Sequence, residues 1–119
     1  MNSAAGIRVL IVEDEPIVAM LAEDLLESIG CVVAGTVASI AEARRAIDNI
    51  TFDVALIDIN LNGEDGLEVA AVLKSRAIPY IITSGYEVAG IAPGHREAFV
   101  LSKPYSIAAL EAAIRGCVR

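Results

Sequence analysis

The sequence lacks the features of membrane and secreted proteins. None of its apolar runs approaches the roughly 20 residues that a membrane-spanning helix needs, so we expect no membrane segment. Residues 1–6 carry no basic stretch ahead of an apolar one, and we interpret them as a short N-terminal tail instead of a signal peptide. These absences predict a cytoplasmic protein.

Cysteine, histidine and basic residues are also scarce. Cys31 and Cys117 have no CxxC partner or neighbouring histidine, so we expect small buried hydrophobic residues and neither metal ligands nor a disulfide. The single histidine, His95, is interpreted as a solvated loop residue. Nine Lys and Arg against 16 Asp and Glu give a net charge of −7, and without clustered bases the domain is not expected to bind nucleic acid.

Short apolar runs alternate along the chain with segments of helical periodicity. The 119 residues, 55% of them hydrophobic, suit one domain with a full core, so residues 1–119 are predicted to form a single domain. Strands that are apolar on both faces and separated by helices form a parallel sheet covered on both sides, which predicts an α/β fold. The predicted strands are Arg8–Val12, Cys31–Val37, Val54–Ile57, Tyr80–Thr83 and Phe99–Leu101.

Helix signals occupy the intervals between these strands. Pro16 suits a first helical turn, and Gly30 provides a stop. Between residues 85 and 97, three glycines and a proline predict a short or irregular helix. The remaining signals are the helical spacing of Ile17, Leu21, Leu25 and Ile29, the capping box of Ser39 and Glu42, and the cap Ser106 of a last helix.

Polar residues gather where the predicted strands end. In open parallel sheets, ligands bind beyond the carboxyl ends of the strands. Alone, each acid there could cap a helix or form a turn, and the lysine could be a solvated loop residue. Together, like charges 4 Å apart repel by about 4 kcal/mol at an effective dielectric of about 20, so we expect a hard divalent cation such as Mg²⁺. The residues at these ends are Glu13, Asp14, Asp58, Thr83, Ser84 and Lys103.

The order and spacing of these residues resemble a known family. The acidic pair Glu13-Asp14, the strand-end Asp58, the run Thr83-Ser84-Gly85 and the pair Lys103-Pro104 are similar to the motifs of receiver domains in bacterial two-component response regulators. The resemblance covers the chain from Arg8 onward. It implies a CheY-like, flavodoxin-like (βα)5 fold, in which a doubly wound parallel sheet has the strand order 2-1-3-4-5.

The resemblance also implies a role for each matching residue. Asp58 would be the phosphoacceptor, and Lys103 would contact the phosphoryl group. Ser84, five residues after the proline that opens the fourth strand, would hydrogen-bond a phosphoryl oxygen, with Thr83 as the alternative. Mg²⁺ would be bound by Asp14, by Asp58 and by the backbone carbonyl of Asn60, with Glu13 holding it through a water.

The implied function is phosphorelay signalling, not enzymatic turnover of a separate substrate. A sensor histidine kinase or phosphotransfer protein would transfer a phosphoryl group from phosphohistidine to Asp58, and the modified domain would switch its contacts with a downstream protein. A homodimer through the face of the fourth helix, fifth strand and fifth helix is compatible with the family.

Three positions depart from the commonest receivers. Asn62 replaces a usual proline, Ser84 replaces the commoner threonine, and Val100 replaces the aromatic residue that moves inward when other receivers are activated. These departures resemble a subgroup of single-domain receivers marked by a P-F-x-F-A-T-G-Y stretch, which here spans residues 79–86.

Other functions fit the sequence less well. A pseudo-receiver that serves only as a binding module would not need the complete acidic set and Lys103. A magnesium-dependent phosphatase of the haloacid dehalogenase type needs a second acid two residues after the nucleophile, where this chain has Asn60. A flavodoxin-type electron carrier needs a phosphate loop rich in Ser, Thr and Gly, where this chain has residues 13–15, all acidic.

Overall fold

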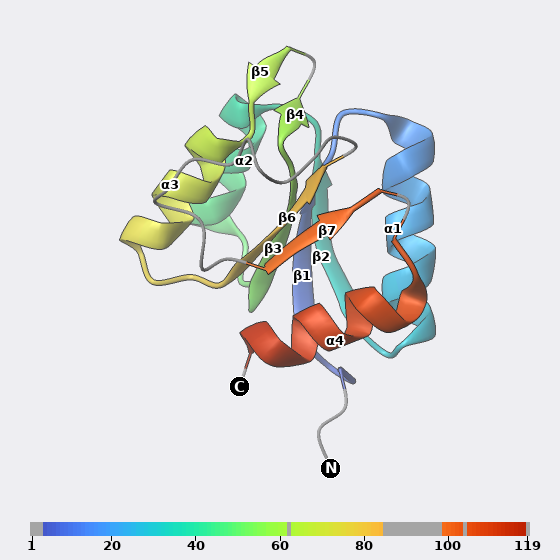
Figure 1. Ribbon diagram of the computed structural model, residues 1–119. Helices are drawn as coiled ribbons and strands as arrows, with labels where there is room; N and C mark the ends of the chain where they lie inside the picture. The colour runs from blue at the N-terminus through green and yellow to red at the C-terminus, as the bar shows by residue number, and fades with distance from the viewer. Residues whose placement is uncertain (1–3, 62, 85–98, 104, 119) are drawn as a thin grey trace.

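A computed structural model describes residues 4–61, 63–84, 99–103 and 105–118. A five-stranded sheet lies at its centre, with neighbouring strands in the order β2-β1-β3-β6-β7 and every pair parallel (Figure 1). This confirms the predicted order of the five main strands. Their bounds are β1 Arg8–Val12, β2 Val32–Val37, β3 Val54–Asp58, β6 Tyr80–Ser84 and β7 Phe99–Ser102.

Four helices cover the two faces of this sheet among the described residues (Figure 1). Two of them, α1 and α4, pack on one face, and α2 and α3 pack on the other. The irregular helix predicted between residues 85 and 97, with His95, lies outside the described residues, and so does part of the face suggested for a homodimer. The bounds are α1 Pro16–Ser28, α2 Ile40–Asn49, α3 Leu67–Ser75 and α4 Ile107–Cys117.

The core has two halves because side chains alternate across each strand. Along β1, Val9 and Ile11 join the half under α1 and α4, whereas Leu10 and Val12 join the half under α2 and α3. All five residues of β3 are buried, including the terminal Asp58. The strands are therefore clamped from both sides up to their carboxyl ends, which fixes the positions of the residues that follow.

Helix α1 forms where the sequence predicted it, but only part of the predicted apolar row packs against the core. Ala19, Ala22 and Leu26 point into the core, whereas Ile17 and Leu21 are 74% and 58% exposed. Small alanines let the helix approach the sheet closely, and this leaves the larger side chains outside. The exposed apolar face of α1 is therefore a surface feature and not part of the core.

Two helices end in the same hydrogen-bond pattern. After α1, the N–H groups of Gly30 and Cys31 donate to the carbonyls of Glu27 and Leu26, at 3.0 Å each. After α3, the N–H groups of Ala77 and Ile78 donate to the carbonyls of Lys74 and Leu73, at 3.1 and 3.0 Å. This is the Schellman motif, which needs a left-handed residue; Gly30 has φ +90°, and Ala77 has φ +57°.

The predicted turn after β3 contains more structure than expected. Asn60–Leu61 (β4) and Glu64–Asp65 (β5) form a small antiparallel hairpin ahead of α3, at the top of Figure 1. Gly63, in the turn, has φ +86°, a conformation that glycine adopts without strain. Separately, no helix in the described part of the chain is long and apolar enough to span a membrane.

Candidate functional site

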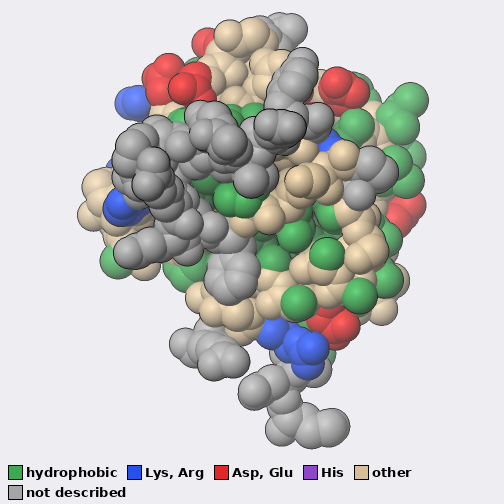
Figure 2. Space-filling view, in the orientation of Figure 1, with side chains coloured by type: hydrophobic (Ala, Val, Ile, Leu, Met, Phe, Trp, Pro, Cys, Tyr) green, Lys and Arg blue, Asp and Glu red, His purple; other side chains and the backbone are tan. Residues whose placement is uncertain are grey.

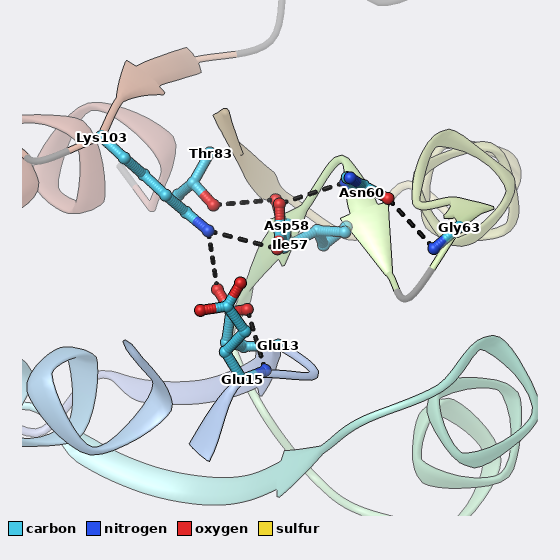
Figure 3. Close-up of polar contacts among 8 residues, drawn as sticks. All are labelled: Glu13, Glu15, Ile57, Asp58, Asn60, Gly63, Thr83 and Lys103. Atoms are coloured by element: carbon cyan, nitrogen blue, oxygen red, sulfur yellow. Dashed lines mark hydrogen bonds and ion pairs between the residues drawn. The ribbon is translucent and has the colours of Figure 1, made fainter. Parts of the chain in front are cut away.

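The parallel sheet brings the polar strand ends to one edge, as Figure 3 shows. Glu13 directly follows β1, and its N–H donates to the Val37 carbonyl of β2 at 2.9 Å. Asp58 is the last residue of β3 and lies opposite Thr83 of β6 in the ladder. Lys103 follows β7, and its N–H donates to the Ser84 carbonyl at 2.8 Å. Sheet hydrogen bonds thus place each side chain through its backbone.

The ammonium group of Lys103 lies between two carboxylates (Figure 3). Its Nζ atom is 2.9 Å from Glu13 Oε1 and 3.2 Å from Asp58 Oδ2. The side chains of Glu13 and Asp58 are only 6% and 8% exposed, and that of Lys103 is 23% exposed. Because water has little access, the charge–charge interactions at this edge are stronger than those of an exposed ion pair.

Burial changes the ionisation of this group of residues. Desolvation raises the pKa of Glu13 to about 7, although the hydrogen bond from Lys103 counteracts part of the shift. Desolvation lowers the pKa of Lys103, but the hydrogen bond to Glu13 and the charge of Asp58 outweigh it, so that this pKa is raised. Lys103 therefore stays cationic at neutral pH, and it holds the two acids together.

Asp14 completes the acidic cluster that the sequence predicted. Ligand oxygens of Glu13, Asp14 and Asp58 all lie within 4.8 Å of one another. Asp14 is half-buried, whereas the other two acids are buried. An all-oxygen set of this kind fits a hard divalent cation such as Mg²⁺.

Asn60 lies at the start of the hairpin beside Asp58. Its N–H donates to Asp58 Oδ1 at 3.1 Å, and its side-chain oxygen accepts from the Gly63 N–H at 3.2 Å. The Gly66 N–H donates to the Ile59 carbonyl at 2.7 Å, which makes Asn60 and Asp65 a non-hydrogen-bonded pair of the ladder. The Asn60 carbonyl therefore has no role in the ladder and can serve a ligand.

Both candidate hydroxyl residues, Thr83 and Ser84, are buried at the end of β6. The Thr83 hydroxyl donates to the Ile57 carbonyl at 3.4 Å, a contact with the backbone of β3 (Figure 3). Because successive residues of a strand point to opposite faces, only one of the two hydroxyls can face a given side of the edge. The preference for Ser84 stays a prediction from spacing.

Sequence reasoning assigned no role to Tyr105, which lies next to this site. With Lys103, its side chain lines a groove of about 530 Å³ along α1. It also lines a small void of about 10 Å³ beside Glu13 and Thr83. Burial raises the pKa of Tyr105, and the nearby charge of Lys103 lowers it in part. Its place two residues after Lys103 was the only sequence signal for this position.

Comparison with known proteins identifies the family. The profile of the response regulator receiver domain matches residues 9–115. The chain therefore belongs to the response regulator receiver domain family, a class of signalling domains, as its fold and strand-edge residues indicate.

Individual relatives agree with this classification. TcrA, a transcriptional regulatory protein of Mycobacterium tuberculosis, is 33% identical over 97% of this chain and 47% of its own length. The phyllosphere-induced regulator PhyR of Methylorubrum extorquens is 34% identical over 89% of this chain and 41% of its own length. The solution structure of SdrG from Sphingomonas melonis is 34% identical with a TM-score of 0.80, covering 95% of this chain and 98% of that one. The chain thus spans less than half of these two curated relatives.

Proposed function

We propose that Asp58 is the phosphoacceptor of this receiver domain and that Lys103 is its cationic partner. The observation that carries the proposal is the position of the Asp58 carboxylate at the sheet edge, with Lys103 Nζ 3.2 Å from Oδ2. A cation at this distance can contact the oxygens of a phosphoryl group when the group is transferred to the carboxylate. The proposed role is a signalling switch in the cytoplasm and not an enzyme with a separate substrate.

The transfer needs little covalent chemistry from the protein. An Asp58 oxygen attacks the phosphorus of a phosphohistidine, the P–N bond breaks, and its electron pair stays on the imidazole nitrogen of the donor. Positioning and charge stabilisation account for most catalysis of phosphoryl transfer. Lys103 can exchange part of its contact with Glu13 and Asp58 for a contact with the phosphoryl oxygens, and this offsets the approach of one anion to another.

The proposed Mg²⁺ ligands are Asp14, Asp58 and the Asn60 carbonyl, with Glu13 acting through a water. When bound, Mg²⁺ would neutralise the oxygens of the phosphoryl group. The ion pair between Glu13 Oε1 and Lys103 Nζ, at 2.9 Å, supports its indirect role, because this carboxylate oxygen already has a cationic partner. Ser84 is proposed to hydrogen-bond a phosphoryl oxygen, and Thr83 is the alternative.

We also propose that the exposed apolar face of α1 receives the sensor kinase or phosphotransfer protein. Ile17, Met20 and Leu21 are exposed on this helix, and Figure 2 shows hydrophobic side chains at the right-hand edge, where Figure 1 places α1. The groove along α1 is lined by Leu21 and Leu25 and also by Lys103, so it is continuous with the phosphoacceptor site. A donor protein must reach that site, and this face is the adjoining apolar surface that it can cover.

Leu21→Ser tests this docking face, since Leu21 lines the groove and is 58% exposed. We expect transfer from a phosphorylated sensor histidine kinase to fall about 10-fold, while uptake from acetyl phosphate is unchanged. Val32→Ser is the matched control, because Val32 is also an exposed apolar residue but lies on β2. Equal losses in both variants, or none in Leu21→Ser, would count against the proposed face.

Intact-mass measurement after incubation with acetyl phosphate tests the function itself. With Mg²⁺ we expect one added phosphoryl group that hydroxylamine removes, as an acyl phosphate requires, and we expect little uptake when a chelator is present. A wild-type chain that gains no phosphoryl group under any of these conditions would favour a pseudo-receiver, which binds partners without phosphorylation.

A further inference from the structure

Gly66 lies against the backbone of the phosphoacceptor. It is buried and forms the N-cap of α3 with φ −60° and ψ −17°, a conformation open to any residue. A Cβ atom at this position would lie 2.0 Å from the carbonyl oxygen of Asp58 and 3.0 Å from both the Asp58 carbonyl carbon and Ile59 Cα. The need for glycine here therefore comes from close approach and not from backbone conformation.

The elements on both sides of this contact are held in place. Asp58 ends the central strand β3, and the Ile59 N–H donates to the Thr83 carbonyl of β6 at 3.0 Å. On the other side, α3 is anchored by Val69, Ala70 and Leu73, all of them fully buried. A methyl group on Gly66 therefore meets backbone on a fixed strand, and a packed core prevents α3 from moving away.

The link between the two elements is the hairpin of β4 and β5. Asn60–Leu61 pairs with Glu64–Asp65 in this hairpin, and the Gly66 N–H closes it with its 2.7 Å bond to the Ile59 carbonyl. The Asn60 N–H, which holds Asp58 Oδ1 at 3.1 Å, belongs to this link. A displacement that starts at Gly66 would thus pass to the Asp58 carboxylate and to the Asn60 carbonyl together.

We propose that Gly66 is a positioning residue, whose missing side chain lets α3 hold the Asp58 carboxylate and the Asn60 carbonyl in the geometry that binds Mg²⁺ and the phosphoryl group. This inference rests on the proposed function of Asp58. It assigns to Gly66 an effect on metal affinity, beyond the stability cost expected for any crowded substitution.

The test compares Gly66→Ala with Gly35→Ala. Gly35 lies in β2, away from the site, and a Cβ there would be 3.1 Å from Ile50 Cδ1, the end of a flexible side chain. Two Mg²⁺ concentrations are measured on each folded variant. The first gives half of the Mg²⁺-induced rise in melting temperature. The second gives half-maximal uptake of phosphoryl groups from acetyl phosphate. Urea unfolding provides the stability of each variant.

We expect Gly66→Ala to raise both Mg²⁺ concentrations about 10-fold, the lower end of the loss seen when groups that orient metal ligands are removed. Gly35→Ala should leave both Mg²⁺ concentrations unchanged, whatever its free energy of unfolding. Unchanged Mg²⁺ dependence in Gly66→Ala would overturn the proposal. If the wild type takes up no phosphoryl group, the proposed function fails, while the melting-temperature titration still decides the role of Gly66.

Loss of folding in Gly66→Ala has its own control. Trimethylamine N-oxide favours the folded state, so the titrations can be repeated in its presence for both the variant and the wild type. A variant that refolds there and shows weakened Mg²⁺ binding supports the proposal. A variant that stays unfolded overturns it, because the methyl group would then disturb the whole fold and not the link between β3 and α3.

Discussion

The last two residues of β3 are buried to nearly the same degree, Ile57 at 1% and Asp58 at 6% exposure, but their surroundings differ in kind. Ile57 packs within an apolar cluster that includes Val12 and Leu73. Asp58 meets the ammonium of Lys103, with a second buried acid, Glu13, on the other side of that ammonium. Burial stabilises the fold at Ile57, whereas at Asp58 it desolvates a charge.

The difference shows how the sheet supports its functional edge. Burial of the apolar strand bodies provides the folding free energy. This free energy offsets the cost of holding like charges near one another at the strand ends. Substitutions in the strand bodies should therefore change the free energy of unfolding, whereas substitutions at the strand ends should change phosphoryl uptake.

Asp58→Asn should abolish stable phosphorylation while the chain stays folded, because an amide cannot form the acyl phosphate. Intact mass after acetyl phosphate treatment measures the loss. Asp48→Asn is the control, since Asp48 is an exposed acid in an ion pair with Arg76 on the α2–α3 side. Uptake of a phosphoryl group by Asp58→Asn at an acid-stable site would contradict the assignment.

Ile57→Ala should have the opposite profile. Removing this buried side chain should lower the free energy of unfolding by about 2–5 kcal/mol, as measured by urea denaturation. The fraction that remains folded should take up phosphoryl groups at the wild-type rate. Val32→Ala, at an exposed position of β2, should change stability much less. A large change in the rate per folded molecule for Ile57→Ala would break the separation between strand body and strand end.

Lys103→Ala should slow phosphoryl uptake about 100-fold, comparable to the loss of one donor that stabilises charge in a transition state. The variant also leaves Glu13 and Asp58 without the cation between them. Time courses of intact mass give the rate, and Lys74→Ala on the exposed side of α3 is the matched control. Wild-type kinetics in Lys103→Ala would remove the lysine from the proposed mechanism.

Mg²⁺ should raise the melting temperature of the unmodified protein, because it offsets repulsion within the acidic cluster. At ten times the dissociation constant the gain corresponds to about 1.4 kcal/mol. Asp14→Ala should remove this gain, whereas Asp24→Ala on α1 should keep it. Melting curves that do not respond to millimolar Mg²⁺ in the wild type would argue against a metal at the strand ends.

The smallest effect concerns a position far from both regions. Ala77 adopts the left-handed conformation that Gly30 adopts in the matching motif, so Ala77→Gly should raise the free energy of unfolding by about 0.5–1 kcal/mol. Gly30→Ala should lower it, since φ is +90° and the new Cβ would lie 3.1 Å from Ala5 Cα. Neither variant should alter the Mg²⁺ dependence of uptake, and urea denaturation measures both.

The sequence predicts the strands and the polar edge because β-branched apolar runs and the residues that follow them are local signals, whereas the strand order came from the family resemblance. The sequence does not predict which face of α1 is buried. Residues 16–28 are apolar on most sides, so the helical spacing of the large side chains does not fix the buried face, and the close approach of Ala19 and Ala22 decides the outcome. At this helix, tertiary packing and not side-chain size determines which residues are buried.

The roles of Asp58 and Lys103 were proposed from their place after strands and from family spacing, and the fold brings them together as expected. Gly66 gave no comparable signal. Its φ is negative and the Asp65-Gly66 dipeptide indicates only a turn, so the contact with the Asp58 carbonyl exists only once α3 has packed on the sheet. The hairpin of β4 and β5 was predicted only as a turn, because its strands have two residues each.

The position of Tyr105 gives the site an intrinsic optical probe. The chain contains no tryptophan, so its near-ultraviolet signals come mainly from three tyrosines. Tyr80 lies at the start of β6, at the end of the strand away from the site, whereas the Tyr105 phenol is half-buried within the field of Lys103, Glu13 and Asp58. Absorbance and near-ultraviolet circular dichroism of this phenol should respond when charges at the strand ends change. Ligand binding can then be titrated on the unlabelled wild-type chain.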